Sequence, residues 1–344
     1  METLSLQARI AVLGKLGQWI LEDKDERLGQ AMRRSEMENS WFTQANIQRS
    51  LNAIAEEFLN PEKLNTWAAQ YPVDGVSPRR VGLIMAGNIP LVGFHDWLCV
   101  FITGHTAVVK LSDKDKHLLP ALLQALAAIE PASAAYTHLV GAEAPLRDFD
   151  AVIATGSNNT ARYFEEYFGK YPHIIRRNRN SVAILSGQET DAELLALGAD
   201  IVSYFGLGCR NVSKLYVPHG YNFEHLMEVL HEYREISLHN KWKNNFDYNF
   251  TLFILNKIPH YNNGCLLLTE NSALQSRIAS LNYEYYNDRY ELEASLQSIS
   301  DQIQCIVSAM SFPNLNTLAF GDTQHPGLKD YPDGVDVMQF LCNL

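Results

Sequence analysis

The stretch VGLIMAGNIPLVGFHDWLCVFITGHTAVVKL, residues 81–111, decides the fold class. It begins with a short apolar run at 81–86 and continues through an apolar, helix-like segment at roughly 91–102. A second strand-like run follows at 106–111. A strand, a helix and a second strand in this order predict a right-handed crossover between parallel strands. Ligands on such sheets bind at the carboxyl ends of the strands.

The alternation of strands and helices continues on the carboxyl side, while the pattern of residues 5–75 predicts helices. We expect helices at 118–129, 159–168, 191–204 and 223–235, and strands at 137–140, 151–154, 181–185, 212–217, 250–255, 303–307 and 317–320. Residues 281–296 are predicted to be helical toward their end, and the tail 321–344 to be mostly loop. Strands that alternate with helices indicate an α/β protein with parallel sheets.

Composition excludes several classes of protein. The 344 residues are 47% hydrophobic, which is typical of a packed globular chain. The net charge of −11 argues against non-specific nucleic-acid binding, and no apolar stretch is long enough for a membrane span. The five cysteines form no C-x-x-C pair, so neither a metal site nor a dithiol motif is indicated. With no signal-peptide pattern at the N-terminus, we expect a cytoplasmic protein.

Cys209 is the candidate nucleophile. It lies in YFGLGCRNV, residues 204–212, between a helix-like stretch and a strand-like run. Glycines before a thiol let a substrate approach the backbone closely, and neighbouring N–H groups with Arg210 would favour the thiolate. The alternative is a buried packing role, the common one for a lone cysteine, which suits Cys99, Cys265 and Cys305 in their apolar runs.

Three further segments stand at the ends of predicted strands. They are GNIP at 87–90, KLSD at 110–113 and ATGS at 154–157, and the last one opens a helix whose N–H groups can receive a phosphate. Neither G-x-G-x-x-G nor a P-loop occurs in the chain.

Taken in order, these segments resemble the aldehyde dehydrogenase superfamily, and within it the acyl-CoA reductases related to the LuxC subunit of bacterial luminescence. The resemblance covers about residues 80–220, and the tail segment 330–336 is similar to the reductase branch. It implies a Rossmann-type cofactor domain at 1–187 that includes the N-terminal helices. An α/β catalytic domain at 188–320 and a tail at 321–344 that returns to the cofactor domain would follow.

The resemblance also implies roles for individual residues. Cys209 would be the nucleophile, and the Asn88 side chain would help to form the oxyanion hole. The cofactor would contact two groups of residues, one after each of two strands: Lys110, Ser112 and Asp113, and Thr155, Gly156 and Ser157.

Two departures from the superfamily pattern are informative. Where aldehyde dehydrogenases have Glu-Leu-Gly-Gly-Lys, this chain has RRNRN at 176–180, without the Glu that activates the hydrolytic water. The loss favours thioester reduction, and nearby His173 is the best available proton donor or acceptor, although a structural role is the alternative. Residues 129–136 leave no room for the β-hairpin that joins subunits in typical members, so the oligomeric state is left open.

The expected activity is therefore reduction of an acyl thioester, carried by CoA or an acyl carrier protein, to an aldehyde. The reaction would pass through a thioacyl group on Cys209 and use a hydride from a nicotinamide cofactor. The resemblance points to NADPH, whereas a carboxylate at Asp113 favours NADH. Two alternatives are an aldehyde dehydrogenase that forms acid and a non-catalytic nucleotide-binding scaffold with the same fold.

Overall fold

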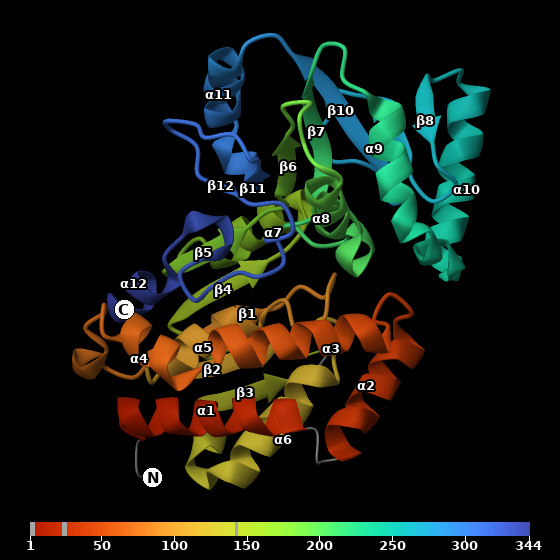
Figure 1. Cartoon of the computed structure of the whole chain (residues 1–344). Coiled ribbons are helices and arrows are strands. Elements are labelled where there is room, and N and C mark those ends of the chain that lie inside the picture. Colours follow the sequence, from red (N-terminus) through yellow and green to blue (C-terminus); the bar gives the residue numbers. More distant parts are fainter. Residues whose placement is uncertain (1–3, 23–25, 142–143) are drawn as a thin grey trace. The chain divides into compact units, whose positions relative to one another are not determined.

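The computed structural model describes residues 4–22, 26–141 and 144–344. The chain folds into two compact units, each built on its own sheet (Figure 1). The first unit contains residues 1–178 and 326–344, and the second contains residues 179–325. The expected boundary at 187 is therefore displaced, because the strand at 180–184 pairs inside the second sheet.

The sheet of the first unit is entirely parallel. Its strand order is β3 (Thr137–Val140), β2 (Thr106–Lys110), β1 (Arg80–Ile84), β4 (Ala151–Thr155) and β5 (His173–Arg176). The crossover helices are α5 (Phe94–Ile102), α6 (Leu118–Ile129) and α7 (Asn158–Phe168). Strands are added in one direction from β1 to β3 and in the other from β4 to β5. The order thus reverses between β1 and β4, which is where such sheets bind ligands.

Helices cover this sheet and pack around α5, since every residue of α5 is buried, the polar His95 and Asp96 included. The N-terminal segment supplies α1 (Leu6–Glu22), α2 (Glu26–Glu38), α3 (Gln44–Ala53), the π-helical turn η1 (Ile54–Phe58) and α4 (Pro61–Ala68). Helix α1 packs on both α5 and α6, and the C-terminal helix α12 (Val337–Cys342) packs on α5. One hydrophobic core joins these helices to β1 and β2.

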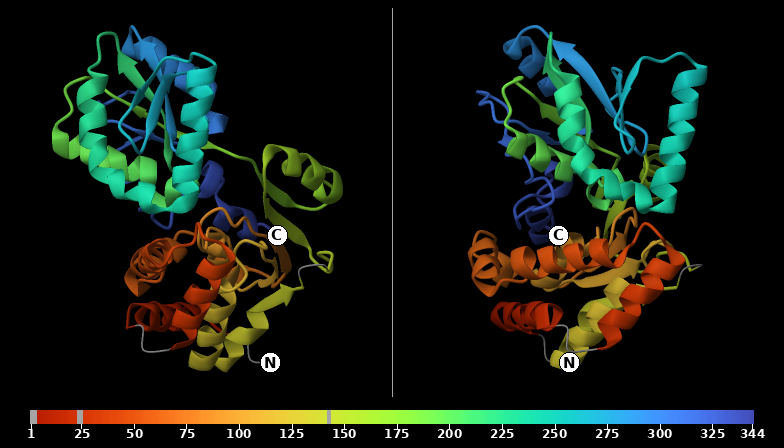
Figure 2. Two further views of the ribbon diagram at one scale, coloured as in Figure 1. Left: turned by 90° about the vertical axis from the view of Figure 1, so that its right-hand side faces the viewer. Right: turned by 45° about the vertical axis from the view of Figure 1, so that its right-hand side comes forward.

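The sheet of the second unit is parallel except for one edge strand (Figure 2). Its order is β12 (Thr317–Leu318), β11 (Ile303–Val307), β6 (Asn180–Ile184), β7 (Val212–Pro218), β10 (Ser280–Tyr286), β9 (Leu267–Glu270) and β8 (His260–Asn262). The helices of this unit are α8 (Asp191–Val202), α9 (Phe223–Leu230), α10 (Asn240–Leu255) and α11 (Arg289–Ser298). A capping box at Thr190 and Glu193 begins α8.

Most of the predicted elements are confirmed, and the helix at 118–129 and the strands at 137–140 and 303–307 have the predicted bounds. The predicted strand at 250–255 is wrong, because these residues end α10. Trp242, Phe246 and Phe253 are buried along one face of that helix at helical spacing.

Three other predictions need correction. Residues 281–296 begin as strand β10 and become helix α11 only at Arg289. The tail is not mostly loop, since α12 is capped by Asp336 and buries three side chains. Helix α5 begins at Phe94 rather than at 91, because residues 85–93 form a structured loop. Strands β5, β8 and β9 were not predicted.

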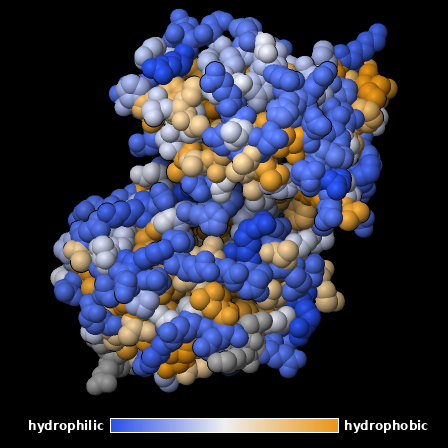
Figure 3. Space-filling view, in the orientation of Figure 1, coloured by the Kyte–Doolittle hydropathy of each residue, from blue (hydrophilic) through white to orange (hydrophobic). Residues whose placement is uncertain are grey.

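The exposed surface carries mainly polar side chains on the face shown in Figure 3. Among the described helices, none combines the length and the apolar character needed to cross a lipid bilayer.

Candidate functional site

The loop after β1 places Asn88 at the carboxyl edge of the first sheet, beside the point where the strand order reverses. The Met85 N–H donates to the Lys110 carbonyl at 3.1 Å, which extends the pairing of β1 with β2. Ser50 then donates from Oγ to the Pro90 carbonyl at 2.8 Å. Asn88 itself is half-buried. The structure therefore holds this loop by contacts from elsewhere in the unit.

The turn after β2 lies directly against this loop. A Cβ on Gly87 would come within 2.5 Å of Ser112 Oγ, so only glycine fits there. The Lys110 Nζ donates to the Ala144 carbonyl at 3.1 Å, and Asp113 is exposed. Lys110, Ser112 and Asp113 therefore stand together with Asn88 at one edge of the sheet.

The end of β4 and the start of α7 complete this edge. The Gly156 N–H donates to the Arg176 carbonyl at 3.3 Å, and a Cβ on Gly156 would meet Thr160 and Phe164 at about 3 Å. Ser157 is the N-cap of α7, and its Oγ accepts from the Thr160 N–H at 3.2 Å. The Thr155-Gly156-Ser157 turn thus leaves the first N–H groups of α7 at the strand-end edge, where an anion can bind.

His173 lies elsewhere. It begins β5 and pairs in register with Val152 near the start of β4, so it stands at the amino edge of the sheet. Four strand residues span about 10 Å, which separates it from the carboxyl edge. His173 is exposed, and its Nδ1 lies 2.8 Å from the Tyr171 carbonyl. Within the first unit, the structure therefore does not bring His173 together with Asn88.

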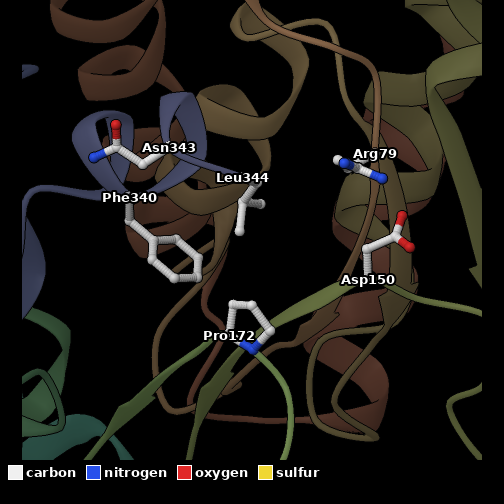
Figure 4. Close-up of a pocket in the computed structure, with 6 residues that line it drawn as sticks. All are labelled: Arg79, Asp150, Pro172, Phe340, Asn343 and Leu344. Carbon is white, nitrogen blue, oxygen red and sulfur yellow. The ribbon is translucent and has the colours of Figure 1, made fainter.

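A cavity of about 480 Å³ opens at the same amino edge (Figure 4). It is lined by Arg79, Asp150, Pro172, Phe340, Asn343 and Leu344. Arg79, Asp150 and Pro172 each lie just before a strand of the sheet. The cavity is therefore at the wrong edge to belong to the Asn88 loop.

Cys209 follows an unusual turn in the second unit. Tyr204, Phe205 and Gly206 all have positive φ, at 50°, 58° and 69°. Tyrosine and phenylalanine rarely adopt this conformation, and such strain persists only where the surroundings impose it. Both side chains are buried, and Phe205 packs on His239 with ring centroids 4.3 Å apart. The turn follows α8 and places the half-buried thiol of Cys209, which is in no disulfide, just before β7.

Two polar side chains that sequence reasoning missed fix the backbone at the thiol. Asn211 is 3% exposed, and its Nδ2 donates to the carbonyls of Asp200 at 3.0 Å and Ser203 at 2.8 Å. Its Oδ1 accepts from the Gly208 N–H at 2.8 Å. Ser181 on β6 donates from Oγ to the Cys209 carbonyl at 2.9 Å. The sequence offered only a polar residue, Asn211, two positions after Cys209. A polar residue at this position is equally typical of an exposed loop.

Three of the other four cysteines differ from Cys209 in their burial, whereas Cys342 is partly buried as Cys209 is. Cys99, Cys265 and Cys305 are buried, whereas Cys209 is only partly buried. Burial raises the pKa of the Cys99 thiol and raises that of Cys265 to about 11. The packing interpretation therefore holds for these buried thiols. Within the described ranges, no three His, Cys, Asp or Glu side chains group as a metal site requires.

Arg176 ends β5 at the carboxyl edge, at the position where the superfamily pattern has its Glu. It is 3% exposed and forms an ion pair from Nη1 to Asp96 Oδ2 in the first turn of α5. The first residue of the segment 176–180 is therefore buried rather than exposed to solvent. A buried guanidinium with a carboxylate partner occupies that position, and a guanidinium cannot act as a general base.

No protein-family model matches the chain, and no curated protein sequence does. Solved structures do match. A putative aldehyde dehydrogenase from Burkholderia cenocepacia aligns with a TM-score of 0.64 at 14% identity, over 90% of this chain and 76% of that one.

Aldehyde dehydrogenase 21 from Physcomitrella patens, in complex with succinate, aligns with a TM-score of 0.64 at 13% identity, over 95% and 84% of the two chains. An NAD⁺ complex of an aldehyde dehydrogenase from Bacillus cereus aligns with a TM-score of 0.61 at 14% identity, over 90% and 73%. The chain thus has the aldehyde dehydrogenase fold, with a Rossmann-type unit and a second α/β unit that carries Cys209.

Proposed function

We propose that the chain reduces an acyl thioester, carried by CoA or an acyl carrier protein, to an aldehyde through a thioacyl group on Cys209. The observation that carries the proposal is the geometry around this thiol. A strained turn and two buried side chains, Asn211 and Ser181, fix the backbone of a half-exposed cysteine. A cysteine that served only for packing would need neither its partial exposure nor the hydrogen bonds by which Asn211 and Ser181 fix the adjoining backbone.

The chemistry follows from these residues. Cys209 Sγ, as thiolate, adds to the thioester carbonyl carbon, and the thiol of CoA or the carrier leaves with a proton. In this proposal the Asn88 amide donates to the developing oxyanion, a contact commonly worth about 3 kcal/mol. When the C–S bond to Cys209 breaks at the end of the reaction, the aldehyde leaves and the thiolate is restored.

A nicotinamide cofactor would supply the hydride that reduces the thioacyl carbon. The residues at the first unit's strand-end edge fit such a group. Gly156 leaves no side chain in the way at the start of α7, and Lys110 adds a positive charge. NADPH is the proposed donor on the LuxC resemblance, although the exposed Asp113 carboxylate suits the ribose diol of NADH.

Arg176 favours reduction over hydrolysis. In the superfamily pattern the Glu at this position activates water, and here the buried Arg176–Asp96 pair replaces it. An enzyme that moves an acyl group between two thiols has no use for an activated water. Oxidation of an aldehyde to an acid is the second candidate, because the similar solved structures are aldehyde dehydrogenases.

The experiment is acylation followed by intact-protein mass spectrometry, with acetyl-, hexanoyl- and tetradecanoyl-CoA in separate reactions. We expect one acyl adduct on the wild type, its removal on addition of NADPH or NADH, and stoichiometric aldehyde. Cys209→Ala should abolish both adduct and aldehyde, while the matched variant Cys305→Ala should keep the adduct.

Other outcomes would overturn the proposal. Aldehyde formation by Cys209→Ala would exclude the covalent mechanism. Acid formed from aldehyde and NAD⁺, without any adduct from acyl-CoA, would establish the dehydrogenase instead. Equal alkylation rates for Cys209 and the buried Cys265 would support the alternative of a non-catalytic nucleotide-binding scaffold.

A further inference from the structure

The loop that carries Asn88 is held in place partly by a buried carboxylate outside it. Leu91 has φ at 57°, which is unfavourable for a bulky residue and must be imposed by its surroundings. The Leu91 N–H donates to Asp115 Oδ2 at 2.7 Å. Asp115 lies in the turn after β2, 24 residues along the chain. It therefore fixes the strained residue three positions after Asn88.

The Asp115 carboxyl is buried with few compensating interactions. It is 8% exposed, and its Oδ1 finds no hydrogen-bond partner within the part of the chain that the structure describes. The carboxyl faces a cavity of about 10 Å³, too small for more than one water, whose other lining is apolar: Met85, Ala86, Leu91, Gly93, Phe94, Leu111 and Leu119. An ionised group buried in this way destabilises the fold unless its interactions compensate.

Asp115 joins two loops through its side chain and its backbone. The Asp115 N–H donates to the Ser112 carbonyl at 3.0 Å, which closes the turn that also contains Asp113. Gly87 packs against Ser112 from the other side. The turn that contains Ser112 and Asp113, which are proposed to contact the cofactor, is thus connected to the loop whose Asn88 is proposed to bind the oxyanion.

We propose that Asp115 is a positioning residue, whose ionised carboxylate holds the Asn88 loop in its reactive geometry and couples it to the turn at 112–115. The part of this inference that concerns reactivity rests on the proposed function. The part that concerns the order of the loop does not.

The electrostatics add a pH dependence. Burial raises the pKa of Asp115 from 3.8 to about 6, against the opposing effects of the Leu91 N–H and the charge of His117. His117 is itself paired with Glu38 of α2 at 3.0 Å. The side chains lining the cavity from the β1 loop, α5 and α6 carry no charge, and Asp96 on α5 is paired with Arg176.

The sign follows from linkage. Because the folded pKa is the higher one, the folded protein binds more protons than the unfolded chain between pH 3.8 and about 6. This contribution to stability is complete below pH 3.8 and is lost as the pH rises through 6. The ionised form that holds the loop is therefore the less stable form. Ionisation of Asp115 is thus expected to lower the stability of the fold and to raise the acylation rate. A purely structural carboxylate would not show these opposite effects.

The test uses three variants. Asp115→Asn keeps a carbonyl oxygen for the Leu91 N–H but removes the charge, and Asp115→Ala removes both. Asp74→Asn is the control, since Asp74 is an exposed carboxylate in a turn of the same unit. Two quantities are measured from pH 5 to 8: the acylation rate with whichever of the three acyl-CoAs labels the wild type fastest, and hydrogen exchange of a peptide covering residues 85–93. The melting temperature is recorded alongside.

We expect the ratio of wild-type to Asp115→Asn acylation rates to rise about 10-fold between pH 5 and 8, with a midpoint near 6. This ratio cancels the ionisation of Cys209, which both proteins share. Asp115→Asn should melt at the same temperature as the wild type or higher at pH 8. Exchange at 85–93, corrected for intrinsic pH effects, should be several-fold faster in Asp115→Ala, and Asp74→Asn should match the wild type throughout.

A rate ratio that stays flat with pH would overturn the positioning role, as would slow acylation that merely follows a lowered melting temperature. If the wild type takes no acyl group from any acyl-CoA, the proposed function fails. The hydrogen-exchange data still show whether Asp115 orders the loop at 85–93. Exchange at 85–93 that is equal in wild type and both Asp115 variants at every pH would then refute the inference by itself.

Discussion

Replacing Asn211 should loosen the nucleophile turn and destabilise the second unit. The Asn211 Nδ2 bonds to the carbonyls of Asp200 and Ser203, which lie beyond the last intrahelical hydrogen bonds of α8. Alanine would leave these two buried carbonyls and the half-buried Gly208 N–H without that partner. At about 1–3 kcal/mol for each buried group, Asn211→Ala should lose about 4 kcal/mol of unfolding free energy.

The assay combines urea unfolding, followed by circular dichroism, with the rate of Cys209 alkylation and acylation. We expect a lower urea midpoint and an acylation rate reduced about 10–100-fold, since small displacements of a nucleophile have effects of this size. The matched control is Asn256→Ala, whose side chain makes one exposed bond to the Leu252 carbonyl. It should change stability by less than about 0.5 kcal/mol.

Asn211→Asp separates hydrogen bonding from side-chain volume. Aspartate keeps an acceptor for the Gly208 N–H but turns a carboxylate oxygen toward two carbonyls, which raises its pKa in the folded state. Its stability deficit relative to the wild type should therefore shrink as the pH falls toward 4. If the free energy of unfolding of Asn211→Ala lies within 1 kcal/mol of the wild-type value and acylation is normal, Asn211 does not fix the backbone at Cys209.

Three further predictions concern the first unit. Asn88→Ala should lower the acylation rate about 10²–10³-fold with little change in melting temperature, whereas early melting with full turnover would make Asn88 a structural residue. Asp113→Ser should shift the ratio of NADPH to NADH affinity several-fold toward NADPH, for about 1 kcal/mol of relieved repulsion, and an unchanged ratio in cofactor titrations would place Asp113 away from the ribose. Arg176→Met should cost about 3–5 kcal/mol in urea unfolding because Asp96 would be left buried and unpaired, and adding Asp96→Asn should recover most of it. A double variant no more stable than the single one would contradict the pair.

The sequence by itself determined the alternation of strands and helices in both units. Apolar periodicity is a local property, so 118–129 and 137–140 could be read from a few neighbouring residues. It also placed Asn88, Lys110 and Gly156 at strand ends, and a parallel sheet brings strand ends to one edge. The prediction of a strand at 250–255 failed because a run of six residues, five of them apolar or aromatic, fits a strand as well as the end of a longer helix.

Only the tertiary structure decided which edge and which partner each side chain meets. The sequence could not separate His173 from the other candidates, because β5 was not predicted and its register was therefore unknown. Asn211, Ser181 and Asp115 act on backbone groups that in most cases are distant in sequence, and no local pattern specifies such contacts. The left-handed turn at Tyr204 and Phe205 is likewise imposed by packing, since the intrinsic preference of both residues is against it. Local patterns thus set the elements, while long-range burial and hydrogen bonding set the geometry of the candidate site.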